Sequence, residues 1–117
     1  MNVPTKLNGY QETATLLLDQ TNPTTSSHYT LTDSIQNYRA LLVLLANNSN
    51  AAEVKSFYIP SVLARSYTRY DCSWNATDST SWYIVCTIQF NSDTGLIVSK
   101  LQRTGFTDSR LIIYGLK

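Results

Sequence analysis

The segment Trp82–Phe90 constrains the fold of this chain more than any other, because its side chains alternate in character. In an extended backbone, one face would hold large apolar side chains and the other a mixed set: Trp82, Ile84, Cys86, Ile88 and Phe90 against Tyr83, Val85, Thr87 and Gln89. A period of two residues indicates a half-buried β-strand. Asn91–Gly95 then predicts a tight turn, and Leu96–Arg103 a returning strand. We therefore expect an antiparallel hairpin with Trp82 in the core.

The rest of the chain consists of short strand-like runs separated by turn-forming residues. Predicted strands cover Thr13–Asp19, His28–Thr32, Tyr38–Ala46, Glu53–Ile59, the Tyr-, Arg- and Thr-rich run Leu63–Trp74, and Arg110–Leu116, with turns or loops at Gln20–Ser27, Thr32–Gln36 and Thr104–Ser109. About eight short strands at this spacing are typical of an antiparallel β-sandwich or a jelly-roll-like barrel. The sequence therefore predicts an all-β fold.

Two of these runs are apolar on both sides of the strand. Tyr38–Ala46 is almost continuously apolar, so periodicity alone does not separate strand from helix, and its Ala and Leu residues leave a helix open. Arg110–Leu116 should bury Leu111 and Ile113, with Gly115 where a side chain would clash or the strand bends. Because a small sandwich has one interior, apolar residues on both sides predict a second cover by another copy of the chain.

The length of 117 residues fits one domain with one hydrophobic core. We expect a polar lead-in at residues 1–9 and a single β-sandwich domain at residues 10–117. Charged residues make up 15% of the chain, against about 25% in a typical soluble domain. An exposed monomer surface usually carries more charge, so this composition also favours self-association.

Composition argues against several classes of partner and cofactor. The net charge is +1 and the nine basic residues are scattered, whereas a nucleic-acid-binding surface needs clustered Lys and Arg. There is no run of 18 apolar residues, so we expect no membrane insertion. With His28 as the single histidine and no CxxC motif, we expect no metal site and no cofactor. Cys72 and Cys86 are expected to be buried thiols, with a disulfide between them as the open alternative.

The sequence contains no recognisable catalytic motif. His28 stands beside a Ser- and Thr-rich loop, but a catalytic triad needs an oriented set, and Ser and Asp are abundant throughout. Asp71, Asp78, Asp93 and Asp108 all occupy turn-like contexts, where Asp usually bonds its own backbone. We therefore expect a binding or assembly module rather than an enzyme, while a glycosidase pair, whose spacing is spatial, stays open.

An aromatic cluster in the middle of the chain supplies the candidate ligand-binding residues. They combine rings that can stack on a sugar with groups that can bond its hydroxyls: Trp74, Tyr67, Tyr70, Arg69 and Asp71. Trp74 lies in a polar Ser-Trp-Asn-Ala setting and is expected to be exposed. The same aromatic residues are equally suited to packing in the core or between subunits.

The order of these runs resembles that of the C-terminal β-sandwich domains of phage tail-fibre and baseplate receptor-binding proteins. The resemblance covers about residues 10–117: an opening strand LLLDQ, a polar NPTTSS loop, HYTL, the apolar NYRALLVLLA, a basic and aromatic middle, and a terminal LIIYGLK. In such domains, the final strand commonly closes with an Ile-Tyr-Gly-aliphatic-Lys sequence.

The resemblance implies a homotrimer that binds a bacterial surface saccharide and contacts other virion proteins. Such a protein is assembled in the host cytoplasm and exposed on the particle surface. Two alternatives stay open. One is a structural virion part, such as a head fibre, decoration protein or assembly tip, without a sugar site. The other is a cellular carbohydrate-binding module, which would be a monomer.

Overall fold

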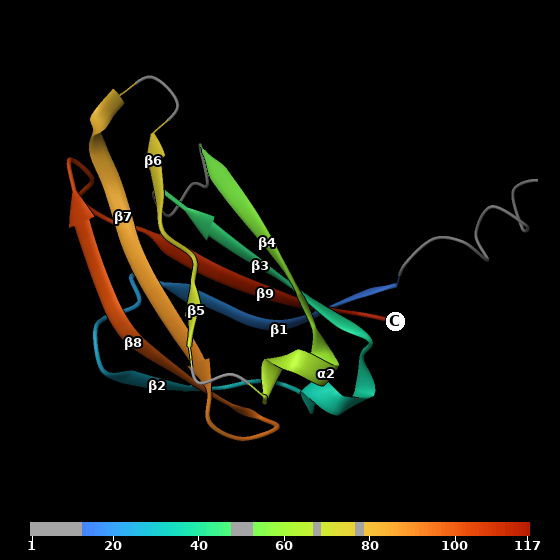
Figure 1. Ribbon diagram of the computed structural model, residues 1–117. Coiled ribbons are helices and arrows are strands. Elements are labelled where there is room, and N and C mark those ends of the chain that lie inside the picture. The colour runs from blue at the N-terminus through green and yellow to red at the C-terminus, as the bar shows by residue number, and fades with distance from the viewer. Residues whose placement is uncertain (1–12, 48–52, 67–68, 77–78) are drawn as a thin grey trace, which may run out of the picture.

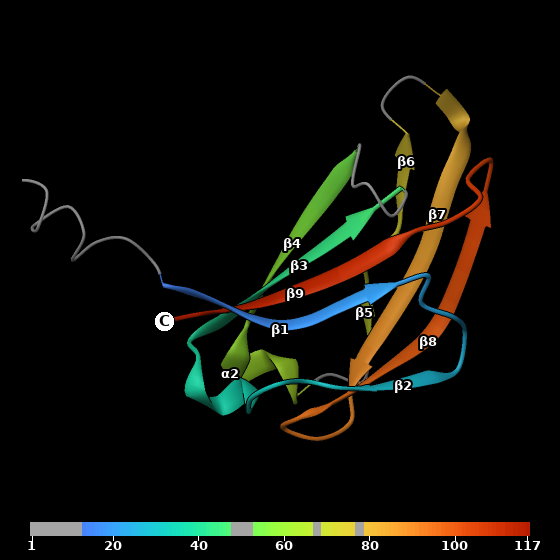
Figure 2. The ribbon, with the colours of Figure 1, turned by 180° about the vertical axis from the view of Figure 1, so that it is seen from behind.

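Two antiparallel β-sheets face each other across a shared core in the computed structural model, which describes residues 13–47, 53–66, 69–76 and 79–117 (Figures 1 and 2). Sheet A contains, in spatial order, β1 (Ala14–Thr21), β9 (Arg110–Leu116), β3 (Ala40–Ala46) and β4 (Val54–Pro60). Sheet B contains β2 (Ser27–Thr30), β8 (Gly95–Thr104), β7 (Ser79–Phe90) and β5 (Tyr70–Asp71), and β6 (Trp74–Ala76) also pairs with β7. The predicted all-β antiparallel sandwich is confirmed.

The hairpin of β7 and β8 forms the centre of sheet B, as its alternation predicts. The turn closes through the Asn91 N–H, which donates to the Gly95 carbonyl at 3.2 Å. Along β7, alternate residues from Ile84 to Phe90 are buried. Their inward side chains meet those of sheet A, and this contact forms the core of the sandwich.

The apolar segment that left a helix open is a strand. β3 lies between β9 and β4, with every residue from Ala40 to Ala46 paired to both neighbours. Leu41, Val43 and Leu45 are fully buried against sheet B. Leu and Ala favour helices in isolation, but here burial on the inner face and two ladders of backbone hydrogen bonds decide the conformation.

The run Leu63–Trp74, predicted as one strand, is divided into three elements. After Pro60 the chain leaves sheet A through the short helix α2 (Ser61–Ala64), which buries Ala64, and then forms β5 and β6 in sheet B. This division gives nine strands in the described part of the chain, where eight were expected. The predicted turn at Thr32–Gln36 contains a 3₁₀ helix, η1 (Ile35–Asn37), whose first turn is capped by the Ser34 hydroxyl. No helix in the described ranges is long and apolar enough to cross a membrane.

The terminal strand β9 lies between β1 and β3 and confirms its predicted burial. Leu111 and Ile113 are fully buried. At Gly115 a Cβ atom would lie 2.5 Å from Cγ of the Tyr38 ring, so this position needs glycine for close packing. The edge strand β1 is paired with β9, and its register shifts between Leu16 and Leu18 through a β-bulge.

The outer face of sheet A, the side turned away from sheet B, is apolar. One row of paired residues crosses all four strands: Leu16, Tyr114, Leu42 and Tyr58. Leu16 is 44% exposed and Tyr58 is 55% exposed, at the two edges of the sheet. The row contains no charged side chain, so this face is unlike a typical solvent-facing surface.

The outer face of sheet B is polar by comparison. Its corresponding row across β5, β7 and β8 consists of Asp71, Thr87 and Lys100. Asp71 and Lys100 are exposed. The sandwich therefore has one polar outer face and one apolar outer face. Strands with apolar residues on both sides predict such an apolar outer face.

Candidate binding site

The four predicted ligand-binding residues that the structure describes do not form one surface. Tyr70 and Trp74 point into the core side of sheet B, whereas Arg69 and Asp71 are exposed. Tyr67 lies outside the described residues. Since alternate side chains of a strand lie on opposite faces, a segment that buries Tyr70 must turn Asp71 outward.

The expectation that Trp74 is exposed is wrong, because its side chain is 8% exposed. Trp74 pairs with Ile84 of β7 and shares the inward face of that strand. Its ring packs on Phe106 at 5.8 Å between centroids, and the Lys55 ammonium lies 5.6 Å from its ring centre. The ring is therefore a packing element and offers no open stacking platform.

Tyr70 and Asp71 also have structural partners. The Tyr70 ring meets Phe90 edge-on at 6.3 Å between centroids, and its hydroxyl donates to the Leu63 carbonyl. Asp71 Oδ1 accepts from the Ser73 N–H at 2.9 Å, which is the local backbone bond expected of Asp in a turn. These contacts account for both residues without a ligand.

The expectation that Trp82 belongs to the core is wrong as well, because it is 51% exposed. β7 extends beyond the end of its neighbour: the last pair with β8 is Tyr83 with Thr104. Trp82 therefore lies past the packed interior, although it has the same alternation as Ile84. Its ring covers Gly105, which has φ +85°, and contacts Phe106 edge-on at 5.9 Å.

Cys72 and Cys86 are free thiols in the core, which agrees with the expected buried thiols rather than the disulfide. The Cys72 N–H donates to the Cys86 carbonyl at 2.8 Å, so Cys72, in the link between β5 and β6, lies beside β7. Burial raises the pKa of the Cys72 thiol to about 12 and also raises that of Cys86. Both groups are thus neutral thiols at physiological pH.

We expect neither thiol to react with a disulfide reagent such as DTNB in the native protein at pH 8. The reactive species is the thiolate, and burial suppresses both its formation and its access to reagent. In guanidinium chloride, both thiols should react. Fast reaction of either cysteine without denaturant would contradict their burial.

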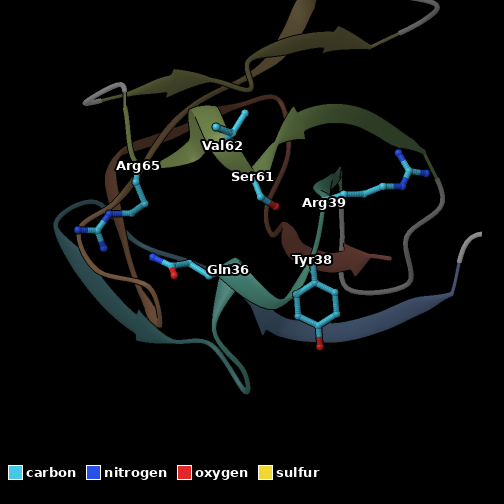
Figure 3. Close-up of a pocket in the computed structure, with 6 residues that line it drawn as sticks. All are labelled: Gln36, Tyr38, Arg39, Ser61, Val62 and Arg65. Atoms are coloured by element: carbon cyan, nitrogen blue, oxygen red, sulfur yellow. The ribbon is translucent and has the colours of Figure 1, made fainter.

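A pocket opens at the end of the sandwich where η1 and α2 lie (Figure 3). Its volume is about 610 Å³, and its lining comes from two separate segments: Gln36, Tyr38 and Arg39, and Ser61, Val62 and Arg65. Figure 3 shows the Gln36 and Ser61 side chains in the middle, with Arg39 and Arg65 directed to opposite ends. The pocket thus presents polar groups from several side chains on a lining that is mainly apolar.

The two arginines of the pocket are positioned by neighbouring groups. Arg39 donates to the Tyr58 hydroxyl at 3.2 Å and, through Nε, to the Lys117 carbonyl at 3.3 Å. Arg65 forms an ion pair with Asp93 at 3.4 Å, and both side chains are about two-fifths exposed. None of the six lining residues is acidic, so the pocket favours anionic or hydrogen-bonding ligands.

Tyr38 is held in the pocket wall by Asp33. The Tyr38 hydroxyl donates to Asp33 Oδ2 at 2.8 Å, while the Ser34 N–H and Asn37 Nδ2 donate to Oδ1. Chiefly through the bond from Tyr38, these donors lower the pKa of Asp33. The same bond raises the pKa of the Tyr38 hydroxyl.

The Asp33→Asn variant should be less stable than the wild type at neutral pH. A carboxyl with a lowered folded-state pKa contributes stability above its unfolded pKa and loses this contribution as pH falls through the folded value. The difference between variant and wild type should therefore shrink as pH falls below 3.8, the ordinary pKa of the group. Urea unfolding of both proteins at pH 7 and pH 3 measures this difference in the free energy of unfolding. A difference that does not change with pH would contradict the role of the Asp33 charge.

Sequence reasoning missed the pocket, and it also missed a signal that would have corrected Trp74. Cys72, Trp74 and Ala76 alternate with polar residues and are all buried, which is the same period-two pattern that identified β7. The pocket has no comparable signal, because its residues lie at the ends of elements and meet through the fold alone. Comparison with models of known protein families and with curated protein sequences gives no match.

Proposed function

We propose that this chain is a non-catalytic adhesion module of a bacteriophage virion, of the tail-fibre or receptor-binding type. In this proposal, three copies assemble through the outer face of sheet A and bind a saccharide of the bacterial surface. Each site binds weakly, and the three together bind more tightly through multivalency. The number three and the virion setting come from the resemblance of the sequence pattern.

The observation that carries the proposal is the contrast between the two outer faces. The row Leu16–Tyr114–Leu42–Tyr58 places apolar side chains across the whole width of sheet A, while the row Asp71–Thr87–Lys100 on the outer face of sheet B is polar. Contiguous apolar surface on a small protein commonly marks an interaction site. The proposed occupant of this face is a second copy of the chain.

Charge on this face is compatible with contact between identical copies. At one corner, Arg110 Nε donates to Asp19 Oδ1 at 2.7 Å, so the two charges compensate each other within one chain. The central row is uncharged, and copies that meet there do not bring like charges together. Cyclic symmetry would then place equivalent sites at one end of the assembly.

A structural virion part without a sugar site is the second candidate. The burial of Trp74 and the internal contacts of Tyr70 support it, since these residues do not offer the stacking surface expected of a glycan site. Both candidates require assembly, whereas a cellular carbohydrate-binding module would be a monomer.

Sedimentation equilibrium tests the assembly. We expect a mass close to three times 13.2 kDa at micromolar concentrations. The double variant Leu16→Glu, Tyr58→Glu should shift this mass to that of the monomer, because both positions are exposed in one chain and would bring like charges together in the assembly. Circular dichroism checks that the variant is folded.

Thr87→Glu, on the outer face of sheet B, provides the matched control and should leave the mass unchanged. A wild-type mass near 13.2 kDa would contradict the trimer. Adsorption of the purified protein to bacterial envelope fractions then separates the two candidates. Binding supports the adhesion module, and a trimer that binds no fraction supports the structural part.

A further inference from the structure

We propose that the pocket between η1 and α2 is the saccharide site of this module and that it selects acidic sugars, those that carry carboxylate or phosphate groups. This inference rests on the adhesion function proposed above and moves its ligand site away from the Trp74 region. The volume of about 610 Å³ is in the usual range for small-ligand pockets.

The middle of the pocket offers groups that suit sugar hydroxyls. Solvent does not reach Ser61 Oγ, and this atom has no hydrogen-bond partner among the described residues. A buried hydroxyl without a partner is costly, and rotation of the Ser61 side chain toward the pocket, where a ligand hydroxyl could bond it, would remove this cost. The Gln36 side chain extends toward Arg65 and carries both a donor and an acceptor (Figure 3).

The ends of the pocket supply positive charge. The Arg65–Asp93 pair is long, at 3.4 Å, and exposed, so it contributes little stability and can exchange its carboxylate for that of a ligand. At the other end, Arg39 is held in place by the Tyr58 hydroxyl and the Lys117 carbonyl. Guanidinium groups are well suited to carboxylates and phosphates because they donate in a planar fork.

The acidic groups near the pocket do not cancel this charge. Asp33 keeps its negative charge, because its donors lower its pKa, and the Lys117 ammonium acts on it electrostatically. Asp93 forms its ion pair with Arg65, and the Lys117 ammonium lies 5.6 Å from the centre of the Tyr38 ring. Among these described groups, Arg39, Arg65 and Lys117 are positive and Asp33 and Asp93 are negative, so an anionic ligand meets a small excess of positive charge.

A non-polar contact completes the site. Val62 lies on the rim and is 79% exposed, which is unusual for a large apolar side chain. The C–H face of a sugar ring can pack on such a side chain while its hydroxyls reach Gln36 and Ser61. This combination of polar floor and apolar rim is typical of small-ligand sites.

Titration of the ¹⁵N-labelled full chain with glucuronate, glucose 1-phosphate and neutral glucose tests the pocket by NMR. We expect saturable shifts at the Gln36 side-chain amide and at Arg65 Nε with the two acidic sugars, and much weaker shifts with glucose. Arg65→Gln should weaken binding about tenfold or more, the factor expected when one charge-assisted hydrogen bond is lost. Lys100→Gln removes one positive charge from an exposed side chain on the outer face of sheet B, outside the pocket, and should leave binding unchanged.

Adsorption to an acidic envelope polysaccharide, measured for the same proteins, separates failure of the pocket from failure of the adhesion function. If Arg65→Gln loses adsorption and the control variant does not, the pocket is supported. If the wild type and Arg65→Gln adsorb equally well, the pocket proposal is wrong but the adhesion function stands. Equal shifts with glucose, or no saturable shifts at Gln36, also overturn the pocket. A chain that adsorbs to no envelope fraction but binds glucuronate at Gln36 contradicts the adhesion function and supports the pocket.

Discussion

Replacement of Ile113 by alanine should lower the free energy of unfolding by about 2–5 kcal/mol, the usual range for a buried Ile. Ile113 is fully buried in β9, the strand between β1 and β3, and pairs with Leu18 and Val43 on either side. Truncation removes apolar contacts and leaves a cavity that a paired central strand cannot readily close. Urea unfolding monitored by tryptophan fluorescence measures the loss.

Ile97→Ala is the matched control for this variant. Ile97 lies in β8 opposite Gln89, on the outer face of sheet B, and is only partly buried. The same chemical change should therefore cost less than about 1 kcal/mol, as expected of a substitution outside the core. A loss below about 1 kcal/mol for Ile113→Ala would show that the burial assigned to β9 is wrong.

Gly115→Ala should also destabilise the fold, by about 1–3 kcal/mol, as is typical of overpacking. The added Cβ atom would lie 2.5 Å from Cγ and 2.6 Å from Cδ1 of the Tyr38 ring. These atoms are near the root of the side chain, and the ring is anchored by its hydroxyl bond to Asp33. A ring held at both ends cannot move aside without loss of that bond.

A double-mutant cycle isolates the contact between Gly115 and Tyr38. In a Tyr38→Ala background the ring is absent, so Gly115→Ala should cost nothing or should regain some stability by filling the space. Thermal unfolding of the four proteins gives the coupling between the two sites. Equal effects of Gly115→Ala in both backgrounds would mean that the ring is not what excludes a side chain at this position.

The fold was predictable from the sequence where alternation and burial agree. Between Ile84 and Phe90 of β7, the residues that alternate are also those that the core covers, so the pattern identified both the strand and its inward face. In β3 the pattern was ambiguous, and pairing with strands distant in sequence resolved it. Alternation shows which residues lie on the same face of a strand, but it does not show how far the opposite sheet covers that face. For this reason Trp74, expected to be exposed, is buried, and Trp82, expected to be buried, is exposed.

The candidate site was not predictable in the same way. The residues of the aromatic cluster were chosen because they are close in the sequence. A strand places such neighbours on opposite faces, as Tyr70 and Asp71 show. The pocket joins Gln36 to Ser61 and Arg65 across a turn, two strands and a short helix. Only the path of the chain between the two sheets brings them together.

The edge strands of sheet A bear on the direction in which copies of the chain can join. An unpaired edge exposes backbone N–H and C=O groups that can add further strands without limit and so lead to aggregation. Here β1 is bent by its bulge near Leu17, and β4 carries the charged Lys55 on the inward side and ends at Pro60. Bulges, inward charges and prolines are features with which natural sheets resist edge-to-edge growth. In the proposed assembly, copies would therefore join through the flat of the sheet, and cyclic closure would give a particle of fixed size instead of an endless ribbon.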